Sequence, residues 1–190
     1  EFNNNKKQID IEKTFIELDK IPLFYKFIKL SVLPDLELEK IVIFLRNNIL
    51  SKYDLYKNNL YVFNFIHALS HLCLNNDYIY GISINEMSII KKLESDILKN
   101  KNDKKANHYK ILLISCFYPL NKFYWISKRQ FSNELSDIYI RHFVERNLEL
   151  KIKKKIKTIG SISDEISKKV ENQYLENPYP KWINLSFETS

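Results

Sequence analysis

The clearest periodic pattern near the C-terminus is a four-residue repeat of apolar residues: Ile162, Ile166, Val170 and Tyr174. Residues at this spacing lie along one side of an α-helix, and the Ser161-x-x-Asp164 pattern signals where such a helix begins. Pro178 and Pro180 then prevent the helix from continuing, because proline lacks a backbone donor and restricts the residue before it. The pattern predicts a helix followed by a stiff, extended arm rich in proline and aromatic residues over 177–190.

Helical periodicity extends over much of the preceding chain. Pro22 lies near the start of a short predicted helix, and Pro34-Asp35 precedes a longer one whose first turn is rich in acids. The capping box Ser83-Ile-Asn-Glu86 predicts another helix. The residues expected to face inward are Leu23, Phe24, Phe27 and Ile28 in the first, Leu38, Ile41, Leu45 and Ile49 in the second, and Ile89, Ile90, Leu93 and Ile97 in the third.

The segment 59–75 is apolar on most sides, which is typical of a helix packed in the middle of its domain. Its polar residues recur at spacings of three, four and four, and they predict one narrow polar line: Asn64, His67, His71 and Asn75. We favour a partly exposed polar edge with ordinary histidines. The alternative is a polar groove for a ligand or for another domain.

The pair His67-x-x-x-His71 has the spacing that lets two imidazoles share a metal ion on one helix face. No third ligand stands at a recognisable spacing from this pair, and no Glu follows His67 as it does in zinc hydrolases. The sequence therefore predicts no metal site and no catalytic residue here.

Residues 76–80 with Gly81 predict a turn that closes the helix, with Gly81 at a positive φ and the aromatic residues folded onto the core. The continuous apolar run 110–118 fits a buried helix or a buried strand. We favour the helix, since no strand partners are evident. One or two further helices are expected within 127–140 and 142–156.

Composition supports this reading of the fold. The chain has 190 residues, 45% of them hydrophobic, which is enough to bury a substantial core. Its only two glycines, Gly81 and Gly160, argue against a sandwich or barrel with many tight turns. We predict an all-α fold: an irregular helical bundle of about seven or eight helices over residues 9–176. Residues 1–8 are expected to be a disordered tail, and residues 177–190 form the extended arm.

The two cysteines, Cys73 and Cys116, lie in apolar runs, which favours buried free thiols and a cytoplasmic location. No apolar stretch approaches the ~20 residues that a membrane span requires, and the N-terminus lacks a signal-peptide core. Because the chain does not begin with Met, we expect it to be part of a longer protein.

The formal charge of +7 raises the question of an anionic partner, but most basic and acidic residues are interleaved. Lys151-Ile-Lys-Lys-Lys-Ile-Lys157 is the strong basic run. We favour a solvated helical surface for it over contact with nucleic acid, since such runs are common on protein surfaces.

Gln173-Tyr-Leu-Glu-Asn-Pro-Tyr-Pro-Lys-Trp182 resembles the Q-Y-E-E-N-P-Y-P-R-W signature of bacterial methyltransferase-like proteins, often preceded by tetratricopeptide repeats. The segment 67–80 resembles the A-L-A-x-Q-C-F-x-N-E-Y-V-F segment of this family, and Tyr118-Pro-Leu120 resembles its Y-x-P-L element. In this order the three cover most of residues 30–182. The chain departs from the family where Leu175 replaces an acid, Lys181 an arginine and His71 a glutamine.

In that family the signature lies just upstream of an S-adenosylmethionine-binding domain. The resemblance implies a downstream domain of this kind as partner, and two patches that dock on it or face its substrate. The first patch is Tyr174, Asn177, Pro178, Tyr179, Pro180 and Trp182, and the second is Asn76, Asp77 and Tyr78. Asn177-Pro-Tyr-Pro180 differs in order from the Asn-Pro-Pro-aromatic motif of amino-methyltransferases, so we transfer no catalytic role to it.

A Rossmann-type methyltransferase binds its cofactor at a glycine-rich turn after a first strand. The two glycines of this chain lie 79 positions apart, each between predicted helices. We therefore expect no cofactor in this chain and a non-catalytic helical accessory domain that docks on, or forms a lid over, a catalytic domain. The alternatives are a small basic module that binds nucleic acid and a protein-interaction scaffold without a ligand.

Overall fold

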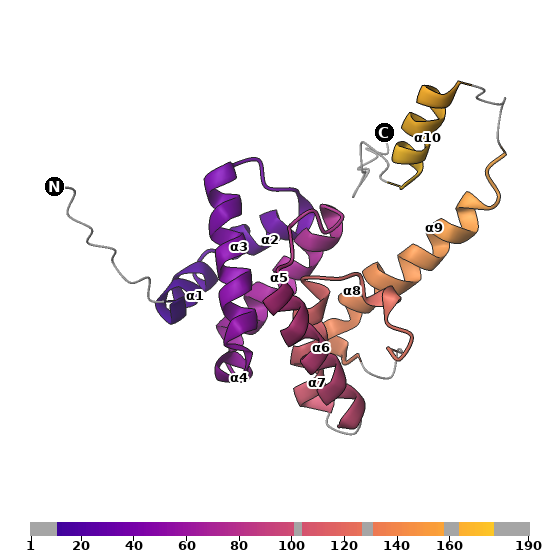
Figure 1. Ribbon diagram of the computed structural model, residues 1–190. Helices are drawn as coiled ribbons and strands as arrows, with labels where there is room; N and C mark the ends of the chain where they lie inside the picture. Colours follow the sequence, from indigo (N-terminus) through magenta and orange to yellow (C-terminus); the bar gives the residue numbers. More distant parts are fainter. Residues whose placement is uncertain (1–10, 101–103, 127–130, 158–163, 177–190) are drawn as a thin grey trace, which may run out of the picture.

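The computed structural model describes residues 11–100, 104–126, 131–157 and 164–176, and Figure 1 shows their arrangement. These residues form helices and connecting turns without a strand, which confirms the predicted all-α class. The helices are α1 (Ile11–Asp19), α2 (Pro22–Leu30), α3 (Leu36–Ser51), α4 (Tyr53–Tyr56), α5 (Leu60–Asn75), α6 (Ile84–Lys99), α7 (Lys104–Ser115), α8 (Ser136–Tyr139), α9 (Arg146–Lys153) and α10 (Glu165–Glu176). Short 3-10 helices, η1 (Leu120–Lys122) and η3 (Asn133–Leu135), and a π-helix, η4 (Ile140–Glu145), complete the described part.

Helix α5 lies in the middle of the body and packs against α1, α2, α3, α7 and α8. It begins where the Asn59 side chain accepts a hydrogen bond of 3.1 Å from the backbone N–H of Val62. Most of its apolar residues after the first turn are fully buried, including Phe65, Ile66 and Leu69. The prediction of a central helix over 59–75 is confirmed, because a rod that is apolar on most sides needs cover on most sides.

Two predicted helix starts are confirmed by their caps. Asp35 accepts a hydrogen bond of 2.7 Å from the backbone N–H of Leu38 at the start of α3. Ser83 and Glu86 form the complete capping box at the start of α6. These caps satisfy backbone donors that have no partner within the helix, so they fix where each helix begins.

The predicted inward faces are only partly right. In α2, Ile28 is fully buried as predicted, whereas Leu23 is 74% exposed and Phe27 38% exposed. In α3 the buried side is formed by Val42, Leu45 and Ile49, while Ile41 is 54% exposed. The reason is that α2 and α3 each cover only one side of α5, and the sequence offers apolar residues on both of their sides.

The run 110–118 is helical through Ser115, as α7, and this helix begins at Lys104, earlier than expected. The turn after α5 differs from the prediction in its backbone. Asp77 and Tyr78 have φ of 54° and 59°, and Gly81 does not adopt the left-handed conformation. Tyr78 nevertheless packs against the core, as expected for this turn.

The segment 136–153 runs through α8, η4 and α9 without a break, and Figure 1 shows α9 leading away from the body. Helix α10 begins at Glu165, where the Asp164 side chain accepts a hydrogen bond of 2.8 Å from Ser167 N–H. The predicted start at Ser161 lies outside the described residues, as do the tail over 1–8 and the arm over 177–190. Within the described ranges, no helix combines the length and the apolar character that crossing a bilayer needs.

Candidate functional site

The polar line of α5 lies against neighbouring helices and is not an exposed edge. His71 and Asn75 are buried, with 7% and 4% of their surface exposed, and Asn64 and His67 are partly buried. Each of the four side chains hydrogen bonds to another part of the chain: Asn64 to Asp19, both histidines to Asp137, and Asn75 to Lys29 and Arg141. The favoured interpretation of a partly exposed edge is therefore wrong for His71 and Asn75.

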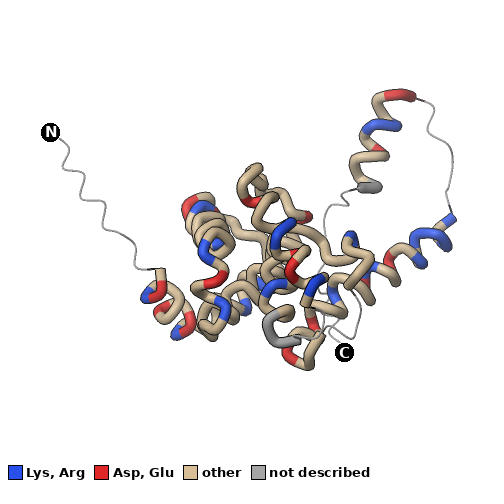
Figure 2. The backbone as a smooth tube through the Cα atoms, turned by 60° about the horizontal axis from the view of Figure 1, so that its bottom comes forward, with Lys and Arg blue, Asp and Glu red and all other residues tan. Residues whose placement is uncertain are grey.

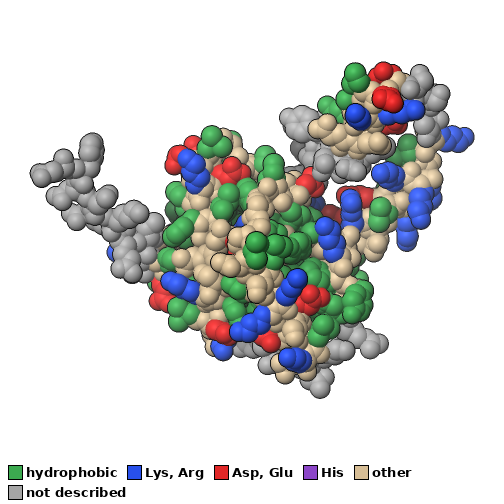
Figure 3. Space-filling view, viewed as in Figure 1, with side chains coloured by type: hydrophobic (Ala, Val, Ile, Leu, Met, Phe, Trp, Pro, Cys, Tyr) green, Lys and Arg blue, Asp and Glu red, His purple; other side chains and the backbone are tan. Residues whose placement is uncertain are grey.

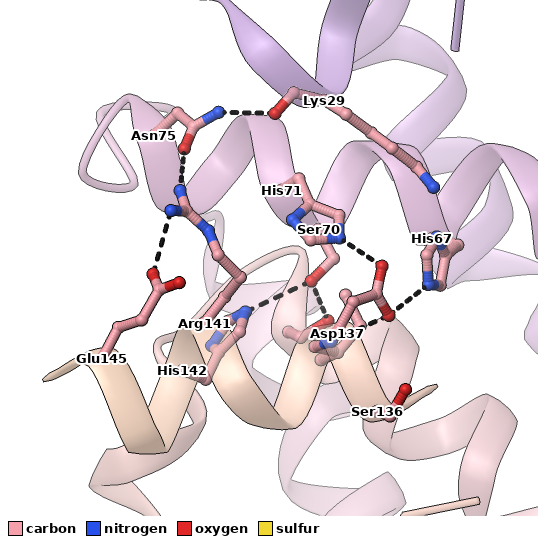
Figure 4. Close-up of polar contacts among 12 residues, drawn as sticks. Lys29, His67, Ser70, His71, Asn75, Ser136, Asp137, Arg141, His142 and Glu145 are labelled. Carbon is pink, nitrogen blue, oxygen red and sulfur yellow. Dashed lines mark hydrogen bonds and ion pairs between the residues drawn. The ribbon is translucent and has the colours of Figure 1, made fainter. Parts of the chain in front are cut away.

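The two histidines converge on one carboxylate, that of Asp137 in α8 (Figure 4). Nε2 of His67 lies 2.9 Å from Oδ1, and Nε2 of His71 lies 3.0 Å from Oδ2. Because an ionised carboxylate only accepts hydrogen bonds, both Nε2 atoms carry a proton in this arrangement. The three side chains thus form a compact cluster of two imidazoles and one carboxylate between α5 and α8.

Local packing sets the orientation of this cluster. The ring of His67 stacks on Phe63 at 6.5 Å between centroids and meets the edge of the His71 ring at 5.5 Å. Asp137 Oδ1 also accepts a hydrogen bond of 2.9 Å from the backbone N–H of Ile138. These contacts limit the rotamers of all three side chains, so the cluster is positioned before any ligand arrives.

Burial and hydrogen bonding shift the pKa values of His71 and Asp137. Burial lowers the pKa of His71, and the hydrogen bond and the negative charge of Asp137 only partly offset this effect. Burial acts to raise the pKa of Asp137, but hydrogen bonds from His67 and His71 outweigh it and hold that pKa well below its usual value. At neutral pH the cluster therefore has an ionised Asp137 and a neutral His71.

Next to this cluster, Ser70, Ser115 and His142 form a second, buried set of hydrogen-bonded side chains. Nε2 of His142 lies 3.3 Å from Ser70 Oγ, and Leu120 N–H donates to Nδ1 at 3.3 Å. Ser115 Oγ lies 2.6 Å from Ser70 Oγ and also contacts the carbonyl oxygen of Leu112. Each donor proton makes one hydrogen bond if His142 Nε2–H donates to Ser70, the Ser70 hydroxyl donates to Ser115, and the Ser115 hydroxyl donates to that carbonyl oxygen. A neutral His142 with its proton on Nε2 satisfies every group.

At the C-terminal end of α5, Asn75 lies between two elements. Its Nδ2 donates to the carbonyl oxygen of Lys29 at 2.9 Å, and its Oδ1 accepts from Arg141 Nη2 at 2.7 Å. Arg141 also pairs with Glu145 at 2.9 Å (Figure 4). The polar line of α5 is therefore matched by a second line on α8 and η4, formed by Asp137, Arg141 and Glu145.

A cavity of about 720 Å³ opens beside this cluster, with His67, Phe63 and Asn64 in its wall. The rest of its lining comes from the turn between α4 and α5, the start of α5, α7 and η3: Lys57, Asn58, Asn59, Leu60, His108, Tyr109 and Glu134. Its size lies within the range of small-molecule sites in proteins, and its lining mixes apolar and polar side chains. The cavity gives a small ligand access to His67.

The second predicted patch is not a continuous surface. Asp77 is exposed, whereas Asn76 and Tyr78 are partly buried and Tyr78 contacts the core. Burial also raises the pKa of the Tyr78 phenol well above its usual value. Of the first patch, Tyr174 lies on α10 and is 54% exposed, and Asn177, Pro178, Tyr179, Pro180 and Trp182 lie outside the described residues. The structure does not bring Tyr174 into the histidine cluster.

The thiols of Cys73 and Cys116 are free and buried, as predicted. Burial raises the pKa of Cys73 to about 12, so its thiol is protonated at neutral pH and is no nucleophile. Within the described residues, neither cysteine therefore supplies a nucleophile to the histidine cluster.

Sequence reasoning missed Asp137, Ser70, Arg141 and His142. A signal was present, since Asp137, Arg141 and Glu145 recur every four residues and predict one polar helix face. What the sequence could not supply is that this face lies against the polar line of α5, more than 60 residues away.

The chain matches no protein-family model, no curated protein and no solved structure. The resemblance to methyltransferase-like proteins therefore depends on the three short segments in the sequence.

Proposed function

We propose that this chain is the helical accessory part of a methyltransferase-like protein, and that α10 with the following arm docks on a catalytic domain. One observation carries this proposal. Ile166, Val170 and Tyr174 lie on one side of α10, and they are 73%, 45% and 54% exposed. An apolar stripe of this kind gains free energy when another surface covers it, by roughly 25 cal/mol per Å² of apolar area.

The position of the stripe supports the choice of partner. Tyr174 belongs to the run 173–182, which resembles the family signature just upstream of an S-adenosylmethionine-binding domain. The stripe therefore leads directly into the segment that the resemblance assigns to the border of the two domains. Proline-flanked aromatic residues at such a border suit a short, stiff spacer that docks at both ends.

The secondary structure supports placing the cofactor in the other domain. Dinucleotide and adenosyl cofactors commonly bind at the carboxyl edge of a parallel sheet, beside a glycine-rich turn. The residues that the structure describes contain no strand and therefore no such edge. We also propose a cytoplasmic location, which the buried free thiols of Cys73 and Cys116 support.

Hydrogen exchange tests the docking in a protein that joins this chain to the catalytic domain proposed after Trp182. Amides of α10 should exchange more slowly there than in the 190-residue chain alone. The double variant Ile166→Asp/Val170→Asp should remove this protection, while Lys168→Asp, on the opposite side of α10, should keep it. Equal exchange of α10 with and without the catalytic domain would overturn the proposal.

Calorimetry of S-adenosylmethionine binding tests whether the arm takes part. Tyr179→Ala and Trp182→Ala should weaken cofactor binding in the joined protein, because the arm orients the accessory part on the catalytic domain. Unchanged affinity in both variants, together with unchanged docking, would remove the arm from the proposed function.

The second candidate function, nucleic-acid binding, is supported by the exposure of the basic run 151–157. Every residue from Lys151 to Lys157 is exposed, and Figure 2 shows positive charge gathered at the far end of α9. A nucleic-acid-binding module predicts salt-sensitive binding to unrelated oligonucleotides that is lost in the triple variant Lys153→Ala/Lys154→Ala/Lys155→Ala. Under the docking proposal, the triple variant leaves the protection of α10 unchanged, so one set of proteins separates the two functions.

A further inference from the structure

We propose that His67, His71 and Asp137 bind one divalent first-row transition metal ion, with further coordination positions open to solvent or a ligand. One ligand atom from each of the three side chains lies within 4.8 Å of the other two. This site is independent of the docking surface on α10. It also replaces the prediction from sequence that no third ligand accompanies the histidine pair.

The geometry is close to what such an ion needs. Metal ions of this class bind imidazole nitrogen and carboxylate oxygen at about 2.0–2.2 Å, so neighbouring ligand atoms lie roughly 3.0–3.5 Å apart. The two nitrogen–oxygen distances are already 2.9 Å and 3.0 Å. An ion that replaces the two Nε2 protons must therefore draw the three ligand atoms, which lie within 4.8 Å of one another, to this spacing by rotation of the side chains.

The placement of the three ligands on two helices also suits a metal site. Histidines four residues apart on one helix face direct both imidazoles to the same point, and the third ligand comes from a separate helix (Figure 4). Two nitrogen ligands and one carboxylate suit zinc, iron, cobalt, nickel or manganese better than calcium or magnesium, which prefer oxygen ligands. A three-ligand protein site leaves positions free, as in catalytic metal sites.

The site is accessible from outside. The Asp137 side chain is 45% exposed, whereas the imidazoles are 12% and 9% exposed, so the protein holds the nitrogen ligands and leaves the carboxylate side open. The cavity of about 720 Å³ has His67 in its wall and gives a second approach. A small anionic or neutral ligand in this cavity could reach an ion bound at His67.

One nearby group opposes the binding of a cation. Figure 4 shows the Lys29 side chain extending from α2 toward His67, and Lys29 interacts electrostatically with Asp137. A positive charge next to the site weakens the binding of a metal ion, because the two cations repel each other. We therefore expect a dissociation constant near the micromolar range, on the order of 1–10 µM.

Isothermal titration calorimetry with zinc chloride, and absorption spectra with cobalt chloride, test this site in the 190-residue chain. The expected result is one ion per chain and a visible cobalt spectrum typical of mixed nitrogen and oxygen ligands. Asp137→Asn and His67→Gln should each weaken zinc binding by at least about tenfold, since each removes one of three ligands. Circular dichroism shows whether each variant keeps its helices, and either variant alone is sufficient if the other does not fold.

The matched control is Asp19→Asn, which removes a carboxylate that also contacts the polar line of α5, through Asn64, but does not belong to the cluster. This variant should bind zinc like the unmodified chain. No zinc or cobalt binding at about 100 µM metal, a concentration well above the expected dissociation constant, would overturn the proposal. Equal binding by the unmodified chain, Asp137→Asn and His67→Gln would also overturn it, since the ion would then lie elsewhere.

Discussion

The backbone N–H of Leu120 donates a hydrogen bond of 3.3 Å to Nδ1 of His142. Since Nδ1 accepts here, the His142 imidazole must be neutral, with its remaining proton directed to Ser70. Burial, reinforced by the nearby side chains of His71 and Arg141, lowers the pKa of His142 to about 3. In the unfolded chain the same imidazole titrates near pH 6.5.

This difference predicts that the protein loses stability in mild acid. Because the unfolded state binds the proton first, stability is fully present above pH 6.5 and falls as the pH decreases toward 3. Between pH 7.5 and pH 5 the free energy of unfolding should fall by about 2 kcal/mol from His142 alone. His71, whose pKa is also lowered, acts in the same direction. Urea denaturation at these two pH values measures the change.

The control for this prediction is His142→Asn, in which an amide replaces the imidazole and cannot titrate. Its stability should depend less on pH over the same interval, even if its absolute stability is lower. A variant with the same pH dependence as the unmodified chain would show that His142 is not the group responsible.

Asp137 should matter for stability more than its exposure suggests. Asp137→Ala leaves two largely buried imidazole N–H groups without their acceptor, and we expect a loss of about 1–2 kcal/mol in the free energy of unfolding. Asp54→Ala is the matched control, since Asp54 forms an exposed pair with Lys57 at 4.0 Å. That variant should change stability by less than about 0.5 kcal/mol. Equal effects in urea denaturation would contradict the assigned role.

Arg46 is a buried cation that aromatic rings and a carbonyl hold in place. Its guanidinium lies 4.4 Å from the Phe117 ring and 5.5 Å from the Tyr80 ring, and it donates to the carbonyl oxygen of Gly81 at 2.8 Å. Arg46→Ala should lower the free energy of unfolding by about 3 kcal/mol, because it leaves a void and an unpaired carbonyl.

Arg46→Met separates these two causes, since it restores most of the volume without the charge. It should cost less than the alanine variant, because the methionine side chain fills most of the void that alanine leaves. Thermal denaturation of the two variants at pH 7 provides the comparison. A methionine variant as unstable as the alanine variant would place the whole effect on the contacts of the guanidinium itself, with Gly81 and the two rings.

Much of this fold could be predicted from the sequence, because its signals are local. The caps at Asp35 and Ser83 and the apolar character of α5 depend on neighbouring residues, and all three are confirmed. The inward side of α2 could not be read in this way, since apolar residues cover both of its sides and only the position of α5 decides between them.

The same limit applies to the site. The spacing of His67 and His71 identifies two of its three ligand side chains, while Asp137 joins them only because α8 packs on α5. Figure 3 shows hydrophobic side chains across much of the visible surface. Apolar character alone therefore does not tell which residues the core contains.

The turn after α5 holds Asp77 at φ 54°, a conformation that costs a residue with a side chain some free energy. Asp77→Gly removes this cost, and we expect the free energy of unfolding to rise by about 0.5–1 kcal/mol. Asp54→Gly, within the short helix α4, is the control and should destabilise the protein. If Asp77→Gly also destabilises the protein in urea denaturation, the side chain of Asp77 contributes more than its backbone costs.

Lys29 allows a test of the metal site that leaves its ligands untouched. Lys29→Met removes the ammonium group near Asp137, and we expect zinc to bind more tightly by about 1 kcal/mol, roughly fivefold. The substitution keeps the Lys29 carbonyl oxygen that accepts from Asn75, so α2 should stay in place. Lys26→Met, at an exposed position of the same helix, is the control and should leave zinc affinity unchanged. Calorimetric titration of both variants decides the question, because an ion bound away from His67 and Asp137 would respond equally to both substitutions.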